Sequence, residues 1–511
     1  MHVKRIAALV ALACAGMSGL ANAALPGSGT AGSAYETVKE ARAAGRVFFV
    51  SGASATQKGF TGIIATLFSG TPYRLANTTA TSKDFEAVAG VMAVGPWAGQ
   101  TAIIIDRVKG GSVWGVNPVA RDLDANGIAP NEGELIESLF VNEDDCPAVG
   151  AGTAASPYTC QTTNGGTRAH MVPDAGISDV APIQFKAPYN TEGETPAASL
   201  SDQELAEFAD TAYNKPIYTL AFGVPVTNNI SPRLTRANVA GIMTGTLGNW
   251  QQVDPAMASD DIIVCRRVQG SGTQAVDNLY FGGYPCSDSL VNAPADRDAT
   301  TAWNDAANTY TINAGSGYQV IENSTSGDVR NCLATAAKAA GGSYATKDRN
   351  GAAVTVTFGP KAGGHKAIGV LSMDSIGGSN ATVLEDWSFR SLDGVGRVAC
   401  KDVAGCPADT SLATITGTGR FPLKASLKDG TWDLQGWISW NVPIRTSTDP
   451  VKGAVAQEFV TAAQDPAVLA AVNDLKAVAL ALPAPFSPYS GANVSDVQYV
   501  GGNQCAPLFK Q

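Results

Sequence analysis

Four short turns rich in glycine and serine carry the residues of this sequence that are best suited to bind an anion. A turn that ends a strand and begins a helix points free backbone N–H groups and the positive end of the helix dipole into the loop. Glycine lets a ligand approach the backbone closely, and serine or threonine hydroxyls add neutral donors. Together these features predict an anion site. The four turns are SGASATQ (51–57), KGGSVW (109–114), GISDVAP (176–182) and RRVQGSGTQ (266–274).

The fourth turn also offers a charged donor. The guanidinium of Arg267 can make a bidentate, charge-assisted contact with a tetrahedral oxyanion. None of the four turns ends in GK[ST], so a nucleotide-binding P-loop is excluded. Each turn taken alone is also compatible with an ordinary surface turn, because 55 glycines in 511 residues make such turns frequent.

Strands that alternate with helices must position these turns. Short apolar runs predict buried strands at 46–50, 101–106, 261–265 and 366–374, and a helix is expected near 34–44. The alternation indicates an α/β fold with its site at the carboxyl ends of strands.

Several polar residues at the predicted helix starts have the spacing of caps. Ser201 with Glu204 forms a capping-box pattern, Thr235 can cap the next helix, and Asp465 followed by Pro466 begins another.

The first residues have the pattern of a secretory signal peptide. Two basic residues precede an apolar run from Ile6 to about Ala15, and the small-residue site ANA stands at 21–23. Residues 1–23 are therefore expected to be removed on export, with a periplasmic or extracellular destination. A lipoprotein acylated at Cys14 is the alternative. No later stretch reaches eighteen uninterrupted apolar residues.

The composition limits the kinds of molecule that the protein is expected to bind. The net charge is −10 at pH 7, which argues against general binding to nucleic acid or to anionic membranes. The length of 511 residues favours two domains. The polar stretch at about 120–170 is expected to be an inserted surface loop.

Eight cysteines remain after the signal peptide, and an even count in an exported chain favours disulfides. We expect Cys146 to pair with Cys160 and Cys400 with Cys406. The partners of the other four stay open: Cys265, Cys286, Cys332 and Cys505.

No cofactor or metal is expected. No CxxC motif occurs, which disfavours zinc. The segment that begins at Asp122 imitates a calcium loop, but its twelfth position is Gly133 where a bidentate glutamate is required.

In this order, the four turns resemble those of the periplasmic phosphate-binding proteins of ABC transporters, the PstS-like family. AGISDVAP and VCRRVQGSGT match the family motifs well, SGASATQ matches the first turn, and KGGSVWGV matches loosely. The resemblance spans most of residues 46–374 and is interrupted by insertions.

The resemblance implies a two-lobed α/β periplasmic-binding-protein-like fold. Each lobe would hold a mixed sheet flanked by helices, and the ligand would lie in the cleft between them. Lobe one would comprise 24–215 plus 374–511, with the insertion at about 120–170, and lobe two 216–373.

Carried over by position, the family's phosphate ligands correspond to eight residues here. They are Thr56, Gln57, Ser112, Asp179, Arg267, Ser271, Gly272 and Thr273. A carboxylate such as Asp179 can accept a hydrogen bond from the proton that phosphate carries and sulfate lacks, so it would select against sulfate.

The sequence departs from the family pattern at three places. Gln57 stands where the family has an aromatic residue, and Gln269 stands where it has an aspartate. The flanks of Ser112 match poorly, so Ser54 or Ser82 is an alternative donor.

The function implied is capture of inorganic phosphate, or a similar protonated oxyanion, by an exported, monomeric, non-enzymatic solute-binding protein. The partner would be the membrane component of an ABC transporter, although the insertions could prevent docking. One alternative is a secreted or surface-associated interaction protein with a degenerate version of the fold. A secreted serine hydrolase with His170 or His365 as base is less favoured, because no GxSxG elbow occurs at these turns.

Overall fold

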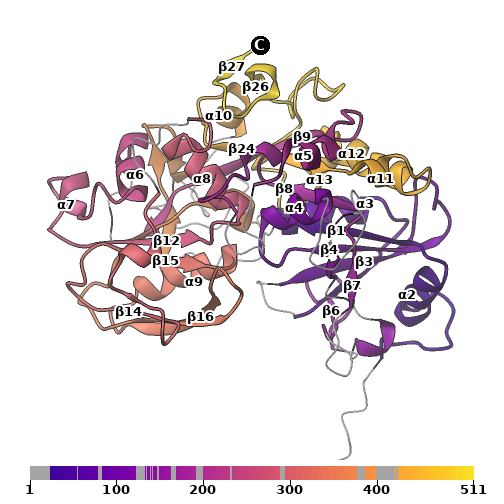
Figure 1. The fold of residues 1–511 in the computed structure, drawn as a ribbon, viewed down its shortest axis with the longest axis horizontal. Helices are drawn as coiled ribbons and strands as arrows, with labels where there is room; N and C mark the ends of the chain where they lie inside the picture. Colours follow the sequence, from indigo (N-terminus) through magenta and orange to yellow (C-terminus); the bar gives the residue numbers. More distant parts are fainter. Residues whose placement is uncertain are drawn as a thin grey trace, which may run out of the picture.

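Two β-sheets, each with helices against it, form two lobes that lie side by side (Figure 1). The structure is a computed structural model. It describes residues 24–53, 56–78, 83–121, 133, 135–138, 140, 142–146, 149–162, 169–191, 199–228, 230, 233–287, 294–376, 386–398, 420–421 and 424–511. The expected signal peptide, the Cys400–Cys406 pair, Ser54, Ser82 and most of the calcium-like segment lie outside the described residues.

The larger lobe is built on a mixed sheet. In the described part of the chain, ten strands form it, in the order β19-β9-β24-β8-β1-β4-β3-β2-β6, with β25 paired to β9. β1 runs parallel to both β4 and β8, whereas β3 and β24 are antiparallel to their neighbours. The strands are β1 (Val47–Gly52), β2 (Tyr73–Ala76), β3 (Phe85–Val91), β4 (Thr101–Arg107), β6 (Tyr158–Thr159), β8 (Ala175–Ser178), β9 (Lys215–Gly223), β19 (Leu371–Ser372), β24 (Gln435–Asn441) and β25 (Ala479–Leu480).

Helices cover both faces of this sheet. On one face, Phe60 of α3 (Gln57–Thr66) and Phe48 of β1 both stack on Phe459 of α12 (Lys452–Gln464), with ring centroids 5.8 and 5.5 Å apart. On the other face, Val38 of α2 (Ala34–Ala43) is fully buried in a second cluster with Phe49. Alternate residues of β1 therefore pack into the cores on the two faces of the sheet, as expected for a strand buried on both sides.

The smaller lobe holds a five-stranded mixed sheet within the described residues, in the order β15-β12-β18-β10-β20. Helix α8 (Gly272–Gly282) packs on β12 and on α6 (Arg236–Met243). Helix α9 (Ser326–Ala336) lies between this sheet and a separate four-stranded one. The five strands are β10 (Pro225–Thr227), β12 (Ile262–Arg267), β15 (Gln319–Asn323), β18 (Lys366–Ile368) and β20 (Trp387–Phe389).

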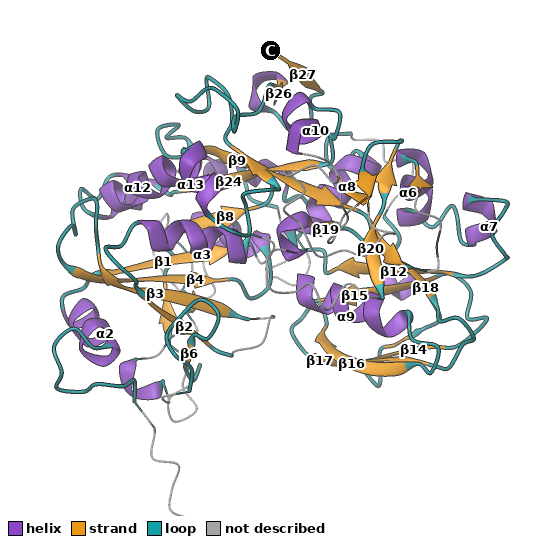
Figure 2. Cartoon of the chain, turned by 180° about the vertical axis from the view of Figure 1, so that it is seen from behind, coloured by secondary structure: helices purple, strands orange, loops and turns teal. Residues whose placement is uncertain are grey.

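The remaining elements are short, and the separate four-stranded sheet lies at the outer end of the smaller lobe (Figure 2). The four-stranded sheet consists of β13 (Trp303–Asn304), β14 (Thr309–Ile312), β17 (Ala353–Phe358) and β16 (Gly342–Lys347). Two-stranded pairs are β5 (Ile136–Glu137) with β7 (His170–Met171), β11 (Arg233–Leu234) with β21 (Ser391–Leu392), β22 (Arg397–Val398) with β23 (Arg420–Phe421), and β26 (Val497–Tyr499) with β27 (Leu508–Lys510). Further helices are α4 (Asn117–Ala120), α5 (Asp202–Leu205), α7 (Trp250–Val253), α10 (Lys424–Asp429), α11 (Ile444–Ser447) and α13 (Pro466–Ala471).

Two of the segments on which the chain crosses between the lobes are adjacent. β9 of the larger sheet continues into β10 of the smaller one through Val224, and β18 returns to β19 through Gly369 and Val370. The N–H of Gly369 donates to the carbonyl of Pro225 (3.0 Å), so the two crossings lie side by side.

The lobe boundaries expected at 215 and 374 differ from these crossings. β9 stays with the larger sheet to Gly223 because it pairs with β24 up to Ala221 and with β19 at Phe222 and Gly223. The chain also returns to the smaller lobe after residue 374, since β20 pairs with β10.

The caps read from the sequence are present. Ser201 and Glu204 form a capping box at the start of α5, and Thr235 accepts from the N–H of Asn238 at the start of α6. Asp465 caps α13 by accepting from the N–H of Ala467. These interactions depend on residues within one helical turn, which is why the sequence predicts them.

Three disulfides are present among the described residues. Cys146–Cys160 is the pairing expected from the sequence, and it pins part of the insertion whose strand β6 joins the edge of the larger sheet. Cys265–Cys332 lies within the smaller lobe, and Cys286–Cys505 joins residues 219 positions apart. In the described part of the chain, no helix has the length and hydrophobicity needed to cross a membrane.

Candidate functional site

The carboxyl ends of β1, β4 and β8 bring three of the predicted turns to one edge of the larger sheet. Because the three strands are parallel, Thr56 and Gln57 after β1, Ser112 after β4 and Asp179 after β8 lie at the same edge. All four side chains are buried.

Glycines allow these turns to approach one another. A Cβ at Gly52 would stand 1.9 Å from the carbonyl oxygen of Ile177, and one at Gly176 would stand 1.9 Å from that of Gly115. No other residue fits at either position without moving backbone. The small residues of the turns are therefore required by the packing of the loops.

The fourth turn approaches from the smaller lobe. Ser271 precedes α8, and Gly272 and Thr273 form its first turn. Thr273 Oγ1 donates to Asp179 Oδ2 (3.3 Å). A Cβ at Gly272 would stand 2.3 Å from Ser112 Oγ and 2.7 Å from Asp179 Cβ. The two lobes thus meet directly at the predicted residues.

Arg267 ends β12 and is held firmly on the smaller lobe. Its Nε donates to the carbonyl of Asn323 (3.2 Å), one terminal nitrogen to that of Ser324 (2.7 Å) and the other to Ser326 Oγ (3.1 Å). A guanidinium has five N–H donors, so two remain beyond these three bonds. Burial lowers the pKa of Arg267 to about 10, against the opposing effect of Asp179, so the group is charged at neutral pH.

Asp179 is a buried carboxyl group with a raised pKa. Burial raises its pKa to about 7; the charge of Arg267 opposes this rise, and the carboxylate of Asp374 adds to it. Asp179 Oδ2 accepts from Thr273, but Oδ1 is buried without a hydrogen-bond partner. Asp179 Oδ1 is therefore available to accept a hydrogen bond from a ligand that carries a proton.

The two helices that begin at the site lack side-chain caps. Thr56 and Ser271 stand at the N-cap positions of α3 and α8, yet neither side chain accepts from the helix N–H groups. By contrast, Ser33, Thr235 and Thr325 cap α2, α6 and α9. The first N–H groups of α3 and α8 are thus left without side-chain acceptors, although hydroxyl residues stand in place.

All eight predicted ligands are described. Ser112, Asp179, Gly272 and Thr273 come into direct contact, and Arg267 is coupled to Asp179 by charge. Thr56 and Gln57 share the strand edge with them, and Gln57 Nε2 is a buried donor without a partner.

Three contributors were missed at the level of sequence. Asp374, in the 3₁₀ turn η6 (Met373–Ile376), is buried and raises the pKa of Asp179. Gln274 accepts from the N–H of Arg267 (3.2 Å), and Ser326 fixes its guanidinium. The strand run ending at Asp374 was recognised, but nothing in its spacing pointed to the site.

Gln269 stands where the resemblance expects an aspartate, and it bonds Asp296 instead of Arg267. Gln269 is buried and its Nε2 donates to Asp296 Oδ2 (3.4 Å). Arg267 takes its hydrogen-bond acceptors from residues 323–326. The loop between β15 and α9 therefore positions the guanidinium in this chain.

The solved structures that this chain is similar to are distant in sequence. No family model matches the sequence, and no curated protein matches it. Among solved structures, an ABC-type phosphate transport receptor from Vibrio cholerae is 13% identical with a TM-score of 0.29, covering 57% of this chain and 74% of that one. A possible phosphate binding protein from Planctomyces limnophilus is 11% identical with a TM-score of 0.33, covering 84% and 92%. A phosphate binding protein from Stenotrophomonas maltophilia is 12% identical with a TM-score of 0.30, covering 58% and 70%. Likenesses this weak do not assign the chain to a family.

Proposed function

We propose that the protein binds inorganic phosphate, or another tetrahedral oxyanion that carries a proton, between its two lobes. The observation that carries the proposal is the setting of Asp179. Its carboxyl group is buried at the meeting point of both lobes, beside donors from Ser112, Thr273 and Arg267, and one of its oxygens has no partner.

The donors present suit an oxyanion. Arg267 supplies one positive charge, the uncapped starts of α3 and α8 supply backbone N–H groups, and the hydroxyls are neutral. The net charge of −10 does not oppose capture, because at physiological salt it is screened beyond about 8 Å.

Asp179 supports a preference for phosphate over sulfate. An ionised carboxylate can accept the proton that phosphate retains near neutral pH, whereas sulfate would meet it with like charge and no hydrogen bond. An unmatched buried acceptor costs about 1–3 kcal/mol, which is roughly a tenfold to hundredfold difference in affinity.

We also propose that the protein acts after export, as a non-enzymatic, monomeric solute-binding protein that passes its ligand to the membrane component of an ABC transporter. The disulfides support an oxidising compartment. For the serine-hydrolase alternative, no hydrogen bond joins a histidine to Ser112 or Ser271 among the described residues; His365 Nε2 instead contacts the carbonyl of Gly359 (2.9 Å).

Titration calorimetry of the full chain with phosphate, arsenate and sulfate tests the proposal. Phosphate and arsenate should bind with one site per chain, and sulfate at least about tenfold more weakly. The absence of heat with all three anions would contradict the proposal and favour the interaction-protein alternative.

A further inference from the structure

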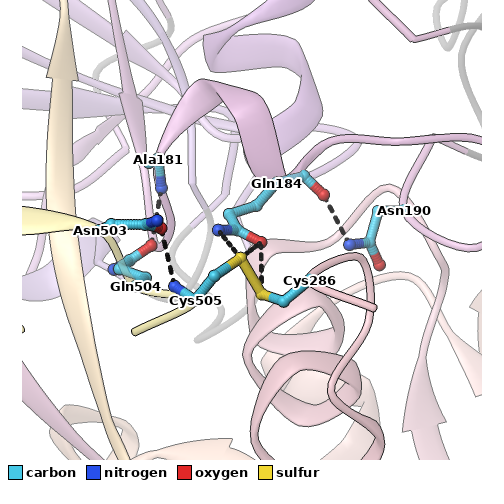
Figure 3. The surroundings of a disulfide bond; sticks show 7 residues. All are labelled: Ala181, Gln184, Asn190, Cys286, Asn503, Gln504 and Cys505. Atoms are coloured by element: carbon cyan, nitrogen blue, oxygen red, sulfur yellow. Dashed lines mark hydrogen bonds between the residues drawn. A yellow bond between two sulfur atoms is a disulfide. The ribbon is translucent and has the colours of Figure 1, made fainter. Parts of the chain in front are cut away.

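A covalent bond joins the two lobes at a distance from the candidate site. Cys286 follows α8 in the smaller lobe, and Cys505 belongs to the C-terminal segment 496–511, which we call the C-terminal strap. Figure 3 shows the disulfide between them, with the side chain of Gln184 against it; Gln184 Nε2 donates to Cys505 Sγ (3.4 Å).

The C-terminal strap is anchored on the larger lobe. Gln504 Nε2 donates to the carbonyl of Trp437 in β24 (3.2 Å), and its Oε1 accepts from the N–H of Ala181, just after β8 (3.0 Å). The ring of Tyr499 packs edge-on against Trp437, with centroids 5.0 Å apart, and its hydroxyl donates to the carbonyl of Gln435 (3.3 Å). Cys505 is therefore fixed to the larger sheet.

Cys286 is fixed to the smaller lobe through α8. The N–H of Cys286 donates to the carbonyl of Gly283 (2.9 Å), the left-handed residue that ends the helix. The same helix begins at Gly272 in the candidate site, so its eleven residues extend about 16 Å from the site towards the disulfide. The disulfide thus holds the far end of the helix that carries the lobe-two donors.

The other contacts between the lobes near the disulfide are non-covalent. Asp433, just before β24, accepts from the hydroxyl of Tyr280 and pairs with Arg236 (3.6 Å). Tyr284 donates to the carbonyls of Lys186 (2.8 Å) and Ala187 (2.7 Å). A cavity of about 540 Å³ separates α8 from the strap beside the disulfide. These contacts can separate when the lobes move, but the disulfide cannot.

This disulfide is more exposed than the other two that the structure describes. Cys286 and Cys505 are both exposed, whereas Cys146, Cys160, Cys265 and Cys332 are at most 3% exposed. Thiol–disulfide exchange requires a thiolate to reach a sulfur atom. A reductant will therefore open Cys286–Cys505 before the other two.

We propose that Cys286–Cys505 is a redox-sensitive latch that limits separation of the lobes and is opened by dithiols. One thiolate of the dithiol attacks a cystine sulfur and releases the other cysteine as a thiolate. The second thiol of the reductant then displaces the remaining cysteine, giving two cysteine thiols and the oxidised, disulfide form of the reductant. When the disulfide is open, the two lobes can separate further, whether or not a ligand is present. Faster release of phosphate in that state rests in addition on the proposed function.

Small-angle X-ray scattering on the phosphate-free full chain tests the opening directly. The Cys286→Ser/Cys505→Ser variant, and the wild type after mild dithiothreitol treatment, should have a larger radius of gyration than the oxidised wild type. The Cys146→Ala/Cys160→Ala variant, which keeps the latch, should match the oxidised wild type and expand on the same treatment. Alkylation and mass spectrometry should find Cys286 and Cys505 modified before Cys146, Cys160, Cys265 and Cys332.

Stopped-flow measurement of phosphate release provides the functional comparison. Release should be at least about tenfold faster without the latch, because affinity changes within one interface act mainly on dissociation. If the scattering changes but phosphate never binds, the latch stands and the proposed function fails. An unchanged radius of gyration in both the serine variant and the reduced wild type would overturn the latch, as would earlier alkylation of the buried cysteines.

Discussion

Thr273 Oγ1 lies 3.3 Å from Asp179 Oδ2, and this hydrogen bond joins the first turn of α8 in the smaller lobe to the end of β8 in the larger lobe. The donor and acceptor come from turns 94 residues apart in sequence. Their contact brings a hydroxyl donor, a charged guanidinium and a carboxyl group to one point between the lobes.

Replacing Thr273 by valine should weaken phosphate binding. The Thr273→Val change keeps the shape of the side chain and removes the hydroxyl, so Asp179 loses a donor and the ligand loses a contact. We expect a loss of about tenfold in affinity by calorimetry. Thr461→Val on α12 is the matched control, since the Thr461 hydroxyl bonds only its own helix at Gln457, and an equal loss in the control would contradict the assignment.

Gly272→Ala should hold the lobes apart. The new Cβ would stand 2.3 Å from Ser112 Oγ and 2.7 Å from Asp179 Cβ. Phosphate affinity should fall by at least about tenfold as the closed contact is lost. Gly282→Ala, at the other end of α8, meets nothing within 4 Å and should bind as the wild type does. Equal affinity in the two variants would show that the lobes do not close on the ligand.

Arg267→Lys should weaken all tetrahedral oxyanions by a similar factor. Lysine keeps the charge but lacks the planar donors that reach Asn323, Ser324 and a ligand together. We expect roughly tenfold to hundredfold loss for both phosphate and sulfate by calorimetry. A loss confined to phosphate would contradict a role in general charge recognition.

Asp179→Asn should stabilise the ligand-free protein in a pH-dependent way. Burial raises the pKa of Asp179 to about 7 from 3.8, so the folded state keeps a proton that the unfolded state has lost between these values. The stability of the wild type therefore falls as pH rises through that window, and asparagine removes the effect. Thermal unfolding should show a gain of roughly 2–4 kcal/mol for the variant at about pH 8 and little difference near pH 4. A difference independent of pH would refute the raised pKa.

Local patterns in the sequence account for much of the fold. Ser201 with Glu204 and Thr235 identified helix starts because each cap depends on residues within one turn. The runs that became β1 and β4 were recognised because strands buried on both faces are continuously apolar.

Contacts between residues far apart in the chain could not be predicted from such local patterns. The pairing of Cys286 with Cys505 and the approach of Asp374 to Asp179 depend on how segments meet in three dimensions. The return of the chain to the smaller lobe at β20 likewise depends on pairing with β10, which its short sequence does not specify. The candidate site residues came from the resemblance of the four turns, taken in order, to those of a known family, because no single Gly-Ser turn is distinctive.

Recognition of a protonated oxyanion by Asp179 is best tested by the ratio of phosphate to sulfate affinity, measured by calorimetry at about pH 8 for the wild type and for Asp179→Asn. We expect the wild type to prefer phosphate at least about tenfold, and the variant to bind both anions with near-equal affinity, because asparagine can donate to either anion. An unchanged ratio in the variant, or a wild type that binds both anions equally, would contradict this role of Asp179.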